Sequence, residues 1–188
     1  SSVDKQGVRR LPISSSPEIF DNSIQAWFKD MTNYDLSLMK FAFKAASEMA
    51  SALQLNEEAA HWKEVGEQLP AFDVDEEGSL TFAKGFPYDQ SHRHFSHAMS
   101  IHPLGLIDYS QGEESRRIIN ATIKRLQDVG PDYWCGYSYS WFGNMKARAF
   151  DGEGAARELK TFAECFCLPN TFHANGDQTK SGKSKFTY

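Results

Sequence analysis

The sequence has no long apolar run and no concentrated block of positive charge. A membrane-spanning helix needs about 20 consecutive apolar residues, and no segment of this 188-residue chain approaches that length. The formal net charge is -5, and the one lysine-rich stretch, residues 180–185, is short and mixed with Ser and Gly. Binding of nucleic acid phosphates needs clustered Lys and Arg. We therefore expect neither a membrane nor a nucleic acid partner.

The cysteines are too few and too irregularly spaced to indicate a metal centre or a disulfide framework. The sequence has three, Cys135, Cys165 and Cys167. Zinc sites built from cysteine use pairs separated by roughly two to four residues, whereas one residue separates Cys165 from Cys167. We expect these two to be core thiols near the end of a helix, and we expect the protein to use no cofactor.

Aromatic residues are abundant in a chain whose composition is that of a folded domain. Hydrophobic residues make up 40% of the sequence and aromatic residues 13%, including 14 Phe and 4 Trp. A chain of this length can bury one ordinary core, so it forms one domain or part of a larger one. Aromatic side chains at this density fit either a large core or a carbohydrate-binding cleft.

Apolar residues recur at three- and four-residue steps, which predicts an all-α protein. The clearest helix follows Thr32-Asn33-Tyr34-Asp35, which has the spacing of a capping box. This helix is apolar nearly all round, as an inner helix of a barrel would be. Alternating apolar residues around Glu77-Gly78 predict one small β-hairpin within residues 72–82. The expected helices are residues 36–53, 57–69, 111–129, 139–150 and 152–167, with Asn56 and Asp151 as caps of the second and the last, and a capping box at Ser110 and Glu113 before the third.

The densest cluster of chemically active side chains lies in the irregular segment 84–109, which holds four of the six histidines. His92, His94 and His97 suggest a metal, because their spacing nearly matches the H-x-H-x-D-H pattern of metallo-β-lactamases. Ser96 stands where that pattern needs Asp, and no alternating strands and helices surround the segment. A zinc-dependent hydrolase remains one alternative, beside histidines that only hydrogen-bond the backbone or one another.

Arg93 lies inside this cluster and would repel a metal cation, but Arg beside His is typical of a sugar site. Both donate hydrogen bonds to ring hydroxyls, while aromatic side chains lie against the apolar face of the sugar. Hydrolysis of a glycoside also needs a carboxylic acid that protonates the leaving oxygen. Glu18 is the candidate acid, because the irregular backbone after Pro17 can aim its carboxyl into a cleft. The alternative for Glu18 is an ordinary acidic residue at a helix N-terminus.

Several short motifs follow one another in an order that is more specific than any one of them alone. They are Ser16-Pro17-Glu18, Asn33-Tyr34-Asp35-Leu36, His92-Arg93-His94-x-Ser96-His97 with Pro103 after it, Gly136-Tyr137-Ser138-x-x-Trp141, and Ala147-Arg148-Ala149-x-Asp151-Gly152. This order, over residues 14–155, resembles that of glycoside hydrolase family 95, the α-L-fucosidase-like group of the six-hairpin glycosidases.

The resemblance implies an (α/α)6 toroid, of which this chain would form a part, and an enzyme that hydrolyses α-L-fucosides with inversion. Some members of the family act on α-L-galactosides instead. By position, Glu18 matches the general acid, and Arg93 and His94 match residues that contact the sugar. His92 and His97 either hold this loop in place or contact the substrate as well.

Trp141 lies in a matching motif and is either a further substrate contact or a core aromatic residue of a helix. The family's water-activating Asp comes late in the barrel and acts with Asn residues that precede the Ser-Pro-Glu motif. Neither can be assigned here, and Asp177 matches the family's late loop only loosely. We therefore expect residues 1–188 to be the C-terminal portion of a single catalytic domain that is inactive as an isolated fragment.

The favoured interpretation is an inverting glycosidase with an oligosaccharide substrate, in which a partly apolar cleft keeps Glu18 protonated near neutral pH. The alternatives are a histidine-cluster metal-dependent hydrolase and a non-catalytic helical carbohydrate-binding module. Part of a toroid would expose apolar helix faces, to be covered by the missing N-terminal half of the barrel or by self-association. The compartment stays open, with a secreted or periplasmic location favoured for the full-length protein.

Overall fold

The computed structural model describes residues 1–187, and this part of the chain is mostly helical with one small antiparallel pair of strands. The all-α class with a small β-hairpin is therefore confirmed. The helices are α1 (Asn33–Ala52), α2 (Asn56–Glu67), α3 (Glu113–Val129), α4 (Gly136–Arg148) and α5 (Gly152–Phe166), and the strands are β1 (Ser2–Val3) and β2 (Arg9–Arg10). Short 3-10 turns are η1 (Ile19–Asn22), η2 (Ile24–Ala26), η3 (Ser96–Ala98) and η4 (Tyr109–Gln111).

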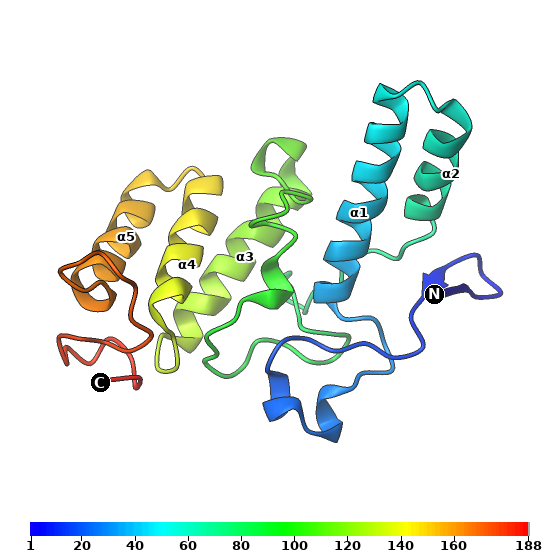
Figure 1. Ribbon diagram of the computed structural model, residues 1–188. Helices are drawn as coiled ribbons and strands as arrows, with labels where there is room; N and C mark the ends of the chain where they lie inside the picture. The colour runs from blue at the N-terminus through cyan, green and yellow to red at the C-terminus, as the bar shows by residue number, and fades with distance from the viewer. Residues whose placement is uncertain (188) are drawn as a thin grey trace.

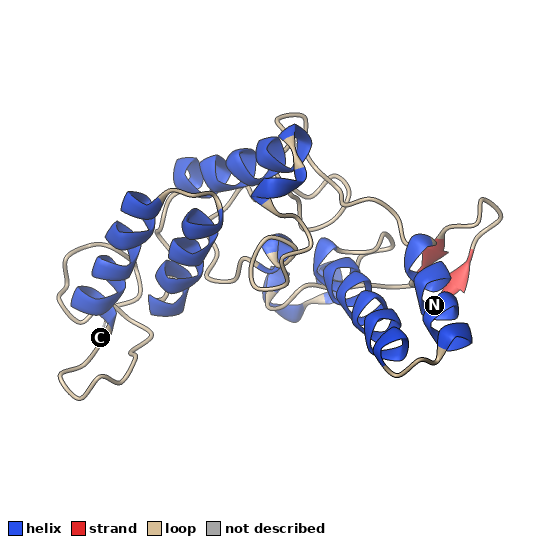
Figure 2. Ribbon diagram, turned by 90° about the horizontal axis from the view of Figure 1, so that it is seen from above, coloured by secondary structure: helices blue, strands red, loops and turns tan. Residues whose placement is uncertain are grey.

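The helices form two hairpins at opposite ends of the molecule. The α1–α2 pair lies near the N-terminus and the α4–α5 pair near the C-terminus, with α3 and the long loops between them (Figures 1 and 2). Successive helical hairpins of this kind are the repeating unit of an (α/α)6 toroid, and the arrangement is consistent with a part of one. Within residues 1–187, no helix combines the length and the apolar character that crossing a bilayer requires.

The start of α1 is fixed by side chains that bind its free backbone N–H groups. The Thr32 hydroxyl accepts a hydrogen bond from the Asp35 N–H at 3.2 Å, as the capping-box spacing predicts. The Asp35 carboxylate does not bond back to Thr32 but accepts from the Ser14 hydroxyl at 2.6 Å. The Ser14 oxygen accepts from the Thr32 N–H at 2.9 Å. The helix is thereby tied to the segment that leads to Glu18.

The side chain of Asn33, fully buried, joins α1 to the turn that follows α2. Its Nδ2 donates to the carbonyl oxygens of Asp73 and Thr81, each at 2.8 Å. Its Oδ1 accepts from the Asp73 N–H at 3.0 Å. Three hydrogen bonds from one buried amide satisfy backbone groups that would otherwise be costly to bury.

The hairpin expected within residues 72–82 forms only as a single antiparallel bridge between Val74 and Leu80, too short to count as two strands. The Asp75 carboxylate accepts backbone N–H groups across the turn, and the Leu80 N–H donates to the Thr122 hydroxyl of α3 at 3.1 Å. Side chains thus bind backbone N–H groups that a longer pair of strands would need for its own hydrogen bonds. The strand pair of the molecule lies instead at the N-terminus, where β1 pairs with β2.

One face of α1 is exposed, although the sequence predicts burial all round. Leu36 and Ala50 are buried, but Phe41, Met49 and Leu53 are 45%, 62% and 70% exposed. Only α2 packs extensively along this helix. The apolar face predicted for a part of a toroid is therefore present, and nothing in residues 1–187 covers it.

Helix starts agree with the sequence within a few residues. Asn56 is the first residue of α2 rather than its cap. The capping box before α3 is formed by Asp108 and Gln111 on η4, so the one expected at Ser110 and Glu113 is wrong. The α4 helix begins at Gly136, three residues before the predicted start. Asp151 caps α5 as predicted, and its carboxylate accepts from the Gly154 N–H at 2.8 Å.

The main core lies between α3, α4, α5 and the loop that joins α2 to α3. Its fully buried members come from both the helices and the loop, which shows that the loop is part of the core. They include Leu80, Tyr88, Phe95, Ile101, Ile119, Leu126, Met145 and Phe166. Because the loop contributes large side chains to this core, its polar residues are held in fixed positions.

Candidate active site

The histidine-rich loop is fixed to the core by three aromatic rings. The Tyr88 hydroxyl donates to the His92 carbonyl at 3.1 Å and accepts from the His92 N–H at 2.9 Å. It also accepts from the indole N–H of Trp134 at 3.2 Å. Phe95 is fully buried and packs on Trp134 with ring centroids 5.1 Å apart. Residues 92–94, just before this anchor, keep partly exposed side chains.

The segment that carries Glu18 is held against this loop by two contacts. The Ser16 and Ser96 hydroxyls, both buried, hydrogen-bond at 2.6 Å. His92 bridges the two segments: its Nδ1 lies 3.1 Å from the backbone nitrogen of His94, and its Nε2 lies 3.3 Å from the Glu18 carbonyl oxygen. Glu18 itself has a left-handed φ of 57°. Such a conformation costs about 1–3 kcal/mol and is often found at functional sites.

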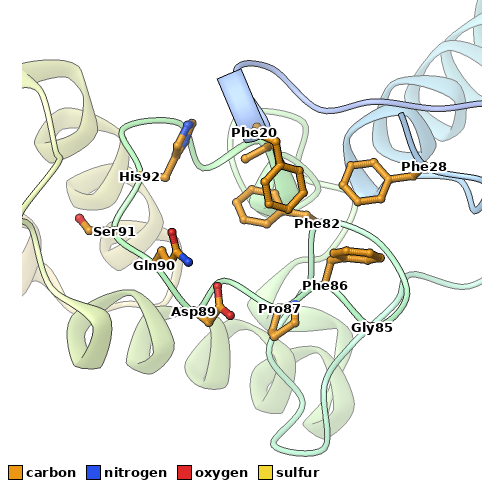
Figure 3. Close-up of a pocket in the computed structure, with 11 residues that line it drawn as sticks. Phe20, Phe28, Phe82, Gly85, Phe86, Pro87, Asp89, Gln90, Ser91 and His92 are labelled. Atoms are coloured by element: carbon orange, nitrogen blue, oxygen red, sulfur yellow. The ribbon is translucent and has the colours of Figure 1, made fainter. Parts of the chain in front are cut away.

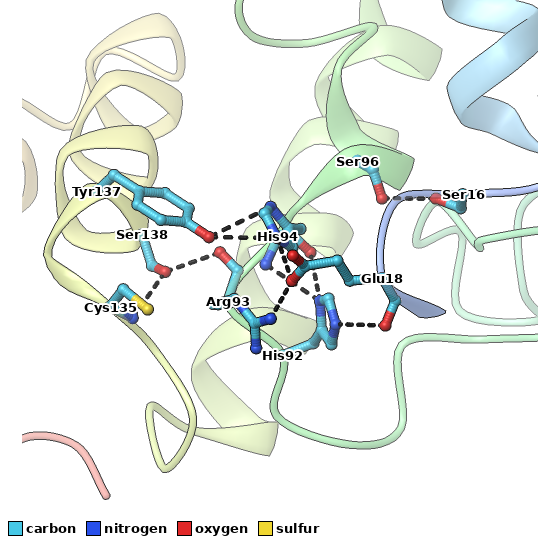
Figure 4. A network of polar contacts seen from close by, with 9 residues as sticks. All are labelled: Ser16, Glu18, His92, Arg93, His94, Ser96, Cys135, Tyr137 and Ser138. Atoms are coloured by element: carbon cyan, nitrogen blue, oxygen red, sulfur yellow. Dashed lines mark hydrogen bonds and ion pairs between the residues drawn. The ribbon is translucent and has the colours of Figure 1, made fainter. Parts of the chain in front are cut away.

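The Glu18 carboxylate meets both of the predicted sugar-contacting residues (Figure 4). One oxygen, Oε2, accepts hydrogen bonds from the Arg93 guanidinium and from His94 Nε2, the latter at 2.7 Å. The Tyr137 hydroxyl lies 3.3 Å from the ring nitrogens of His94. Glu18 thus meets Arg93 and His94, which lie about 75 residues further along the chain. Tyr137, which the sequence did not single out as a site residue, joins them through His94.

The charge state of Glu18 in the structure differs from the expected one. Burial raises the pKa of Glu18, but the hydrogen bond from His94 and the charges of His94, Arg93 and His92 outweigh it and lower the pKa below its usual value. The side chain is 43% exposed, so the cleft is not apolar enough to reverse that balance. The expectation of a raised pKa is wrong here, because the fold places the Arg93 guanidinium and a His94 hydrogen bond at the Glu18 carboxyl.

The pocket around this cluster has a volume of about 430 Å³, a size usual for small-molecule sites. Its wall includes residues that the sequence did not single out. The Arg93 guanidinium lies over the ring of Phe186, 5.8 Å from its centroid, so the tail forms one side of the pocket. The full lining is Glu18, Arg93, His94, Cys135, Tyr137, Asn175 and Phe186. Motif order had placed Tyr137 near Trp141, but no local pattern pointed to Asn175 or Phe186.

The N-terminus of α4 connects this wall to the histidine loop. The Ser138 hydroxyl, fully buried, donates to the Arg93 carbonyl at 2.8 Å. Its oxygen also accepts from the Cys135 N–H at 3.1 Å. Burial raises the pKa of the Cys135 thiol, which keeps it protonated in the pocket wall. The position of Arg93 therefore depends on the start of α4.

His97 does not reach the pocket. It is fully buried between Tyr88 and Phe82, with ring centroids at 5.1 and 4.7 Å, and neither ring nitrogen has a hydrogen-bond partner within residues 1–187. Burial lowers its pKa to about 3. The loop-holding role fits this position, whereas a direct contact with substrate does not. Because His97 points into the core, it cannot share a metal ion with His92 and His94, and the described residues hold no other group arranged for one.

Trp141 lies beside the pocket rather than in it. Its indole N–H donates to the His102 carbonyl at 2.9 Å, and its ring packs against Phe95 with centroids 5.7 Å apart. The ring is partly exposed and lines a separate hollow, which Tyr137 also lines. Trp141 is thus neither a fully buried core residue nor a part of the Glu18 pocket.

Asp177 organises the tail. Its carboxylate, fully buried, accepts hydrogen bonds from the Thr179 and Ser181 hydroxyls at 2.7 and 2.6 Å, and from the Thr179 N–H at 2.9 Å. Burial raises the pKa of Asp177, but these hydrogen bonds lower it further than burial raises it. The residue does not line the pocket, so its geometry offers no water-activating role.

A second hollow, of about 210 Å³, lies beside His92 (Figure 3). Four phenylalanine rings dominate it, and Phe28 and Phe86 meet edge to face at 4.8 Å. It shares no lining residue with the Glu18 pocket. Its lining includes Phe20, Phe28, Phe82, Phe86, Pro87, Gln90 and His92.

The model of the glycosyl hydrolase family 95 catalytic domain matches residues 2–184 of the chain. A search of curated proteins finds no match. The matched range spans the acid segment, the histidine loop and the start of α4, which are the parts that the motif order had indicated. The chain therefore belongs to glycosyl hydrolase family 95, and its sequence is that of the catalytic domain of a glycosidase with a carbohydrate substrate.

Proposed function

We propose that this protein is an inverting hydrolase of α-L-fucosides or the related α-L-galactosides. The observation that carries the proposal is the convergence of Glu18, Arg93 and His94 on one pocket. A carboxyl group that can deliver a proton, next to donors that can bind ring hydroxyls, is the arrangement needed on the acid side of glycoside hydrolysis.

In the proposed reaction, Glu18 donates its proton to the glycosidic oxygen while Arg93 and His94 hold the sugar. In the structure these two donors bind the Glu18 carboxylate itself and lower its pKa. Sugar hydroxyls that compete for the same donors weaken that stabilisation, and removal of water adds to the cost of the charged form. The pKa of Glu18 therefore rises as the sugar binds, and the site takes up the proton it later delivers.

This coupling is open to direct measurement. Calorimetric titration of a non-hydrolysable sugar analogue at pH 6, in buffers of different ionisation enthalpy, gives the number of protons taken up. We expect uptake by the wild type and none by the Glu18→Gln variant. Equal uptake in both would assign the proton to another group.

The water-activating group of an inverting enzyme lies about 6.5–9.5 Å from the acid. Within residues 1–187, Glu18 is the one carboxylate that lines the pocket, and Asp177 is committed to the tail. We infer that the base comes from another part of the catalytic domain, and that residues 1–188 are the C-terminal portion of a single (α/α)6 domain. The exposed face of α1 supports this inference.

The proposed covering of α1 can be tested on the isolated chain. We expect residues 1–188 alone to self-associate or to bind a separately produced N-terminal half of the barrel, since exposed apolar patches are uncommon on soluble monomers. Replacement of Met49 and Leu53 by Gln, checked by light scattering, is expected to abolish that association. A chain that is monomeric with and without the replacements would contradict the proposed covering.

The main test of the function uses the complete catalytic domain and Glu18→Gln. A lost general acid costs typically 10²–10⁴-fold in rate, and we expect that loss for an oligosaccharide with an α-L-fucosyl end. For α-L-fucosyl fluoride, whose leaving group needs little protonation, we expect a much smaller loss. Asp21→Asn is the matched control, because Asp21 is an exposed carboxylate of the same segment that does not line the pocket.

Two outcomes would contradict the proposal. Unchanged turnover of both substrates by Glu18→Gln would remove this residue from the mechanism. An anomeric product of retained configuration, seen by proton NMR in the first minutes of reaction, would exclude inversion.

A further inference from the structure

A third hollow lies along the exposed side of α4, where residues one helical turn apart share a face. Tyr137, Trp141 and Asn144 line it from the helix, and His102 and Pro103 line it from the facing loop. Its volume is about 310 Å³, at the lower end of the range typical of small-molecule sites. An aromatic ring beside polar side chains is suited to a sugar, which has an apolar face and a rim of hydroxyls.

The indole ring of Trp141 is held in one orientation. Its N–H is used by the His102 carbonyl at 2.9 Å, and Phe95 supports it from the core side. Because the N–H is occupied, the ring offers its electron-rich face rather than a donor. A ring that is already fixed loses little conformational freedom when a ligand lies against it.

Polar groups flank this ring. Nδ1 of His102 accepts from Nε of Arg148 at 3.3 Å, and burial lowers the pKa of His102. The neutral ring therefore carries its proton on Nε2, where it can donate to a hydroxyl. The amide nitrogen of Asn144 donates to the Ser140 carbonyl at 2.9 Å, which orients its side-chain oxygen to accept. The hollow thus contains both a donor and an acceptor for hydroxyl groups.

The hollow adjoins the Glu18 pocket, because Tyr137 lines both. The Tyr137 hydroxyl contacts His94, which in turn binds the carboxylate. The phenylalanine hollow beside His92 has no lining residue in common with the Glu18 pocket. Of these two hollows, the one beside Trp141 therefore shares a wall residue, Tyr137, with the Glu18 pocket.

We propose that the hollow beside Trp141 binds the sugar unit on the leaving side of the scissile bond, with the ring of that sugar against the indole face. This inference rests on the proposed function and narrows it, because it makes the preferred substrate an oligosaccharide rather than a simple glycoside. Binding energy from this remote sugar unit then contributes to the rate at the reacting bond.

The test compares Trp141→Ala and Trp141→Phe in the complete catalytic domain. For an oligosaccharide with an α-L-fucosyl end, we expect Trp141→Ala to lower kcat/KM by about tenfold and Trp141→Phe to restore most of the loss. For α-L-fucosyl fluoride, whose leaving group cannot reach the hollow, kcat/KM stays within twofold of wild type. The fluoride also reports whether the fold survives. Phe86→Ala, which alters the phenylalanine hollow, is the control and is expected to leave the ratio of the two substrates unchanged.

The results separate the two proposals. Loss of oligosaccharide turnover in Glu18→Gln together with an unchanged substrate ratio in Trp141→Ala would overturn this inference and leave the proposed function intact. A selective loss in Phe86→Ala instead would assign the second sugar to the other hollow and also overturn it. Failure of Glu18→Gln to affect any substrate would count against the proposed function itself.

Discussion

The ion pair between Lys146 and Glu158 joins α4 to α5 and gives a test of how firmly α4 is held. Nζ lies 2.6 Å from Oε1, and the two side chains are only 4% and 16% exposed. The ammonium also lies over the ring of Phe142, 4.4 Å from its centroid. Since α4 carries Tyr137 and Ser138, its placement on α5 determines the wall of the pocket.

The test is a double-mutant cycle in which methionine replaces Glu158, Lys146 or both. Methionine is unbranched and favours helices. Removing one partner of a buried pair costs about 3–5 kcal/mol, because the other charge is left uncompensated. We expect Glu158→Met to cost about 3 kcal/mol, the lower end, since Phe142 retains some attraction for the ammonium. In a domain of this size that lowers Tm by about 6–12 °C.

The stabilities expected for the other two variants follow from how deeply each charge is buried. Lys146→Met leaves a carboxylate that can turn toward water, so we expect a loss of about 1 kcal/mol. The double variant replaces both charges by apolar groups of similar volume, which is often neutral or stabilising. We expect its stability to lie near that of wild type.

Thermal unfolding followed by circular dichroism at 222 nm, with urea titrations for the free energies, measures all four proteins. The reasoning is refuted if the double variant is as unstable as Glu158→Met, since the stranded charge would then not be the cause. It is also refuted if Lys146→Met costs more than Glu158→Met.

Three further predictions concern stability. Burial holds the pKa of His97 at about 3 against 6.5 in an open chain, so the unfolded state alone binds this proton and stability falls by about 1.4 kcal/mol per pH unit from pH 6.5 down to about pH 3. Urea titrations at pH 6.5 and 4.5 measure this slope, and we expect it to be smaller in His97→Phe by the contribution of one proton. An equal slope in the wild type and in His97→Phe would contradict the prediction. Gly136→Ala is expected to lower Tm although Ala favours helices, because the added Cβ would lie 2.7 Å from Cβ of Phe166. In the control Gly66→Ala, the added Cβ has its nearest neighbour at 3.6 Å, and we expect the free energy of unfolding to rise by about 0.5 kcal/mol. Asn33→Ala removes three hydrogen bonds and is expected to cost about 3 kcal/mol by calorimetry; a loss below 1 kcal/mol would show that water replaces them.

Features that depend on neighbours in sequence could be predicted. Thr32 and Asp151 cap α1 and α5 as the sequence indicates, because a cap involves side-chain and backbone groups within one turn. The helices follow their apolar periodicity to within a few residues. That the hairpin at 72–82 would stop at one bridge could not be predicted, since Asn33 and Thr122, far away in sequence, bind its backbone groups.

Features of the irregular loop had no periodicity to guide them. His92 and His94 face the Glu18 segment while His97 turns into the core, yet the three look alike in sequence. What distinguishes them is the burial of Phe95 and the stacking of His97 on Tyr88, both of which are tertiary contacts. The resemblance to a family supplied the roles expected for Arg93 and His94, and the fold brings both residues to Glu18.

The lowered pKa of Glu18 follows from the same kind of contact. No local pattern reveals that a carboxyl at position 18 will accept hydrogen bonds from residues 93 and 94, and those bonds decide its charge. What holds the segments together is a few buried hydroxyls: Ser16 bonds Ser96, and Ser138 bonds the Arg93 carbonyl. Each such bond contributes only about 1 kcal/mol to stability. The fold therefore survives their loss more readily than the site does, because a small shift of Arg93 relative to Glu18 changes the charge on the acid while the core remains intact.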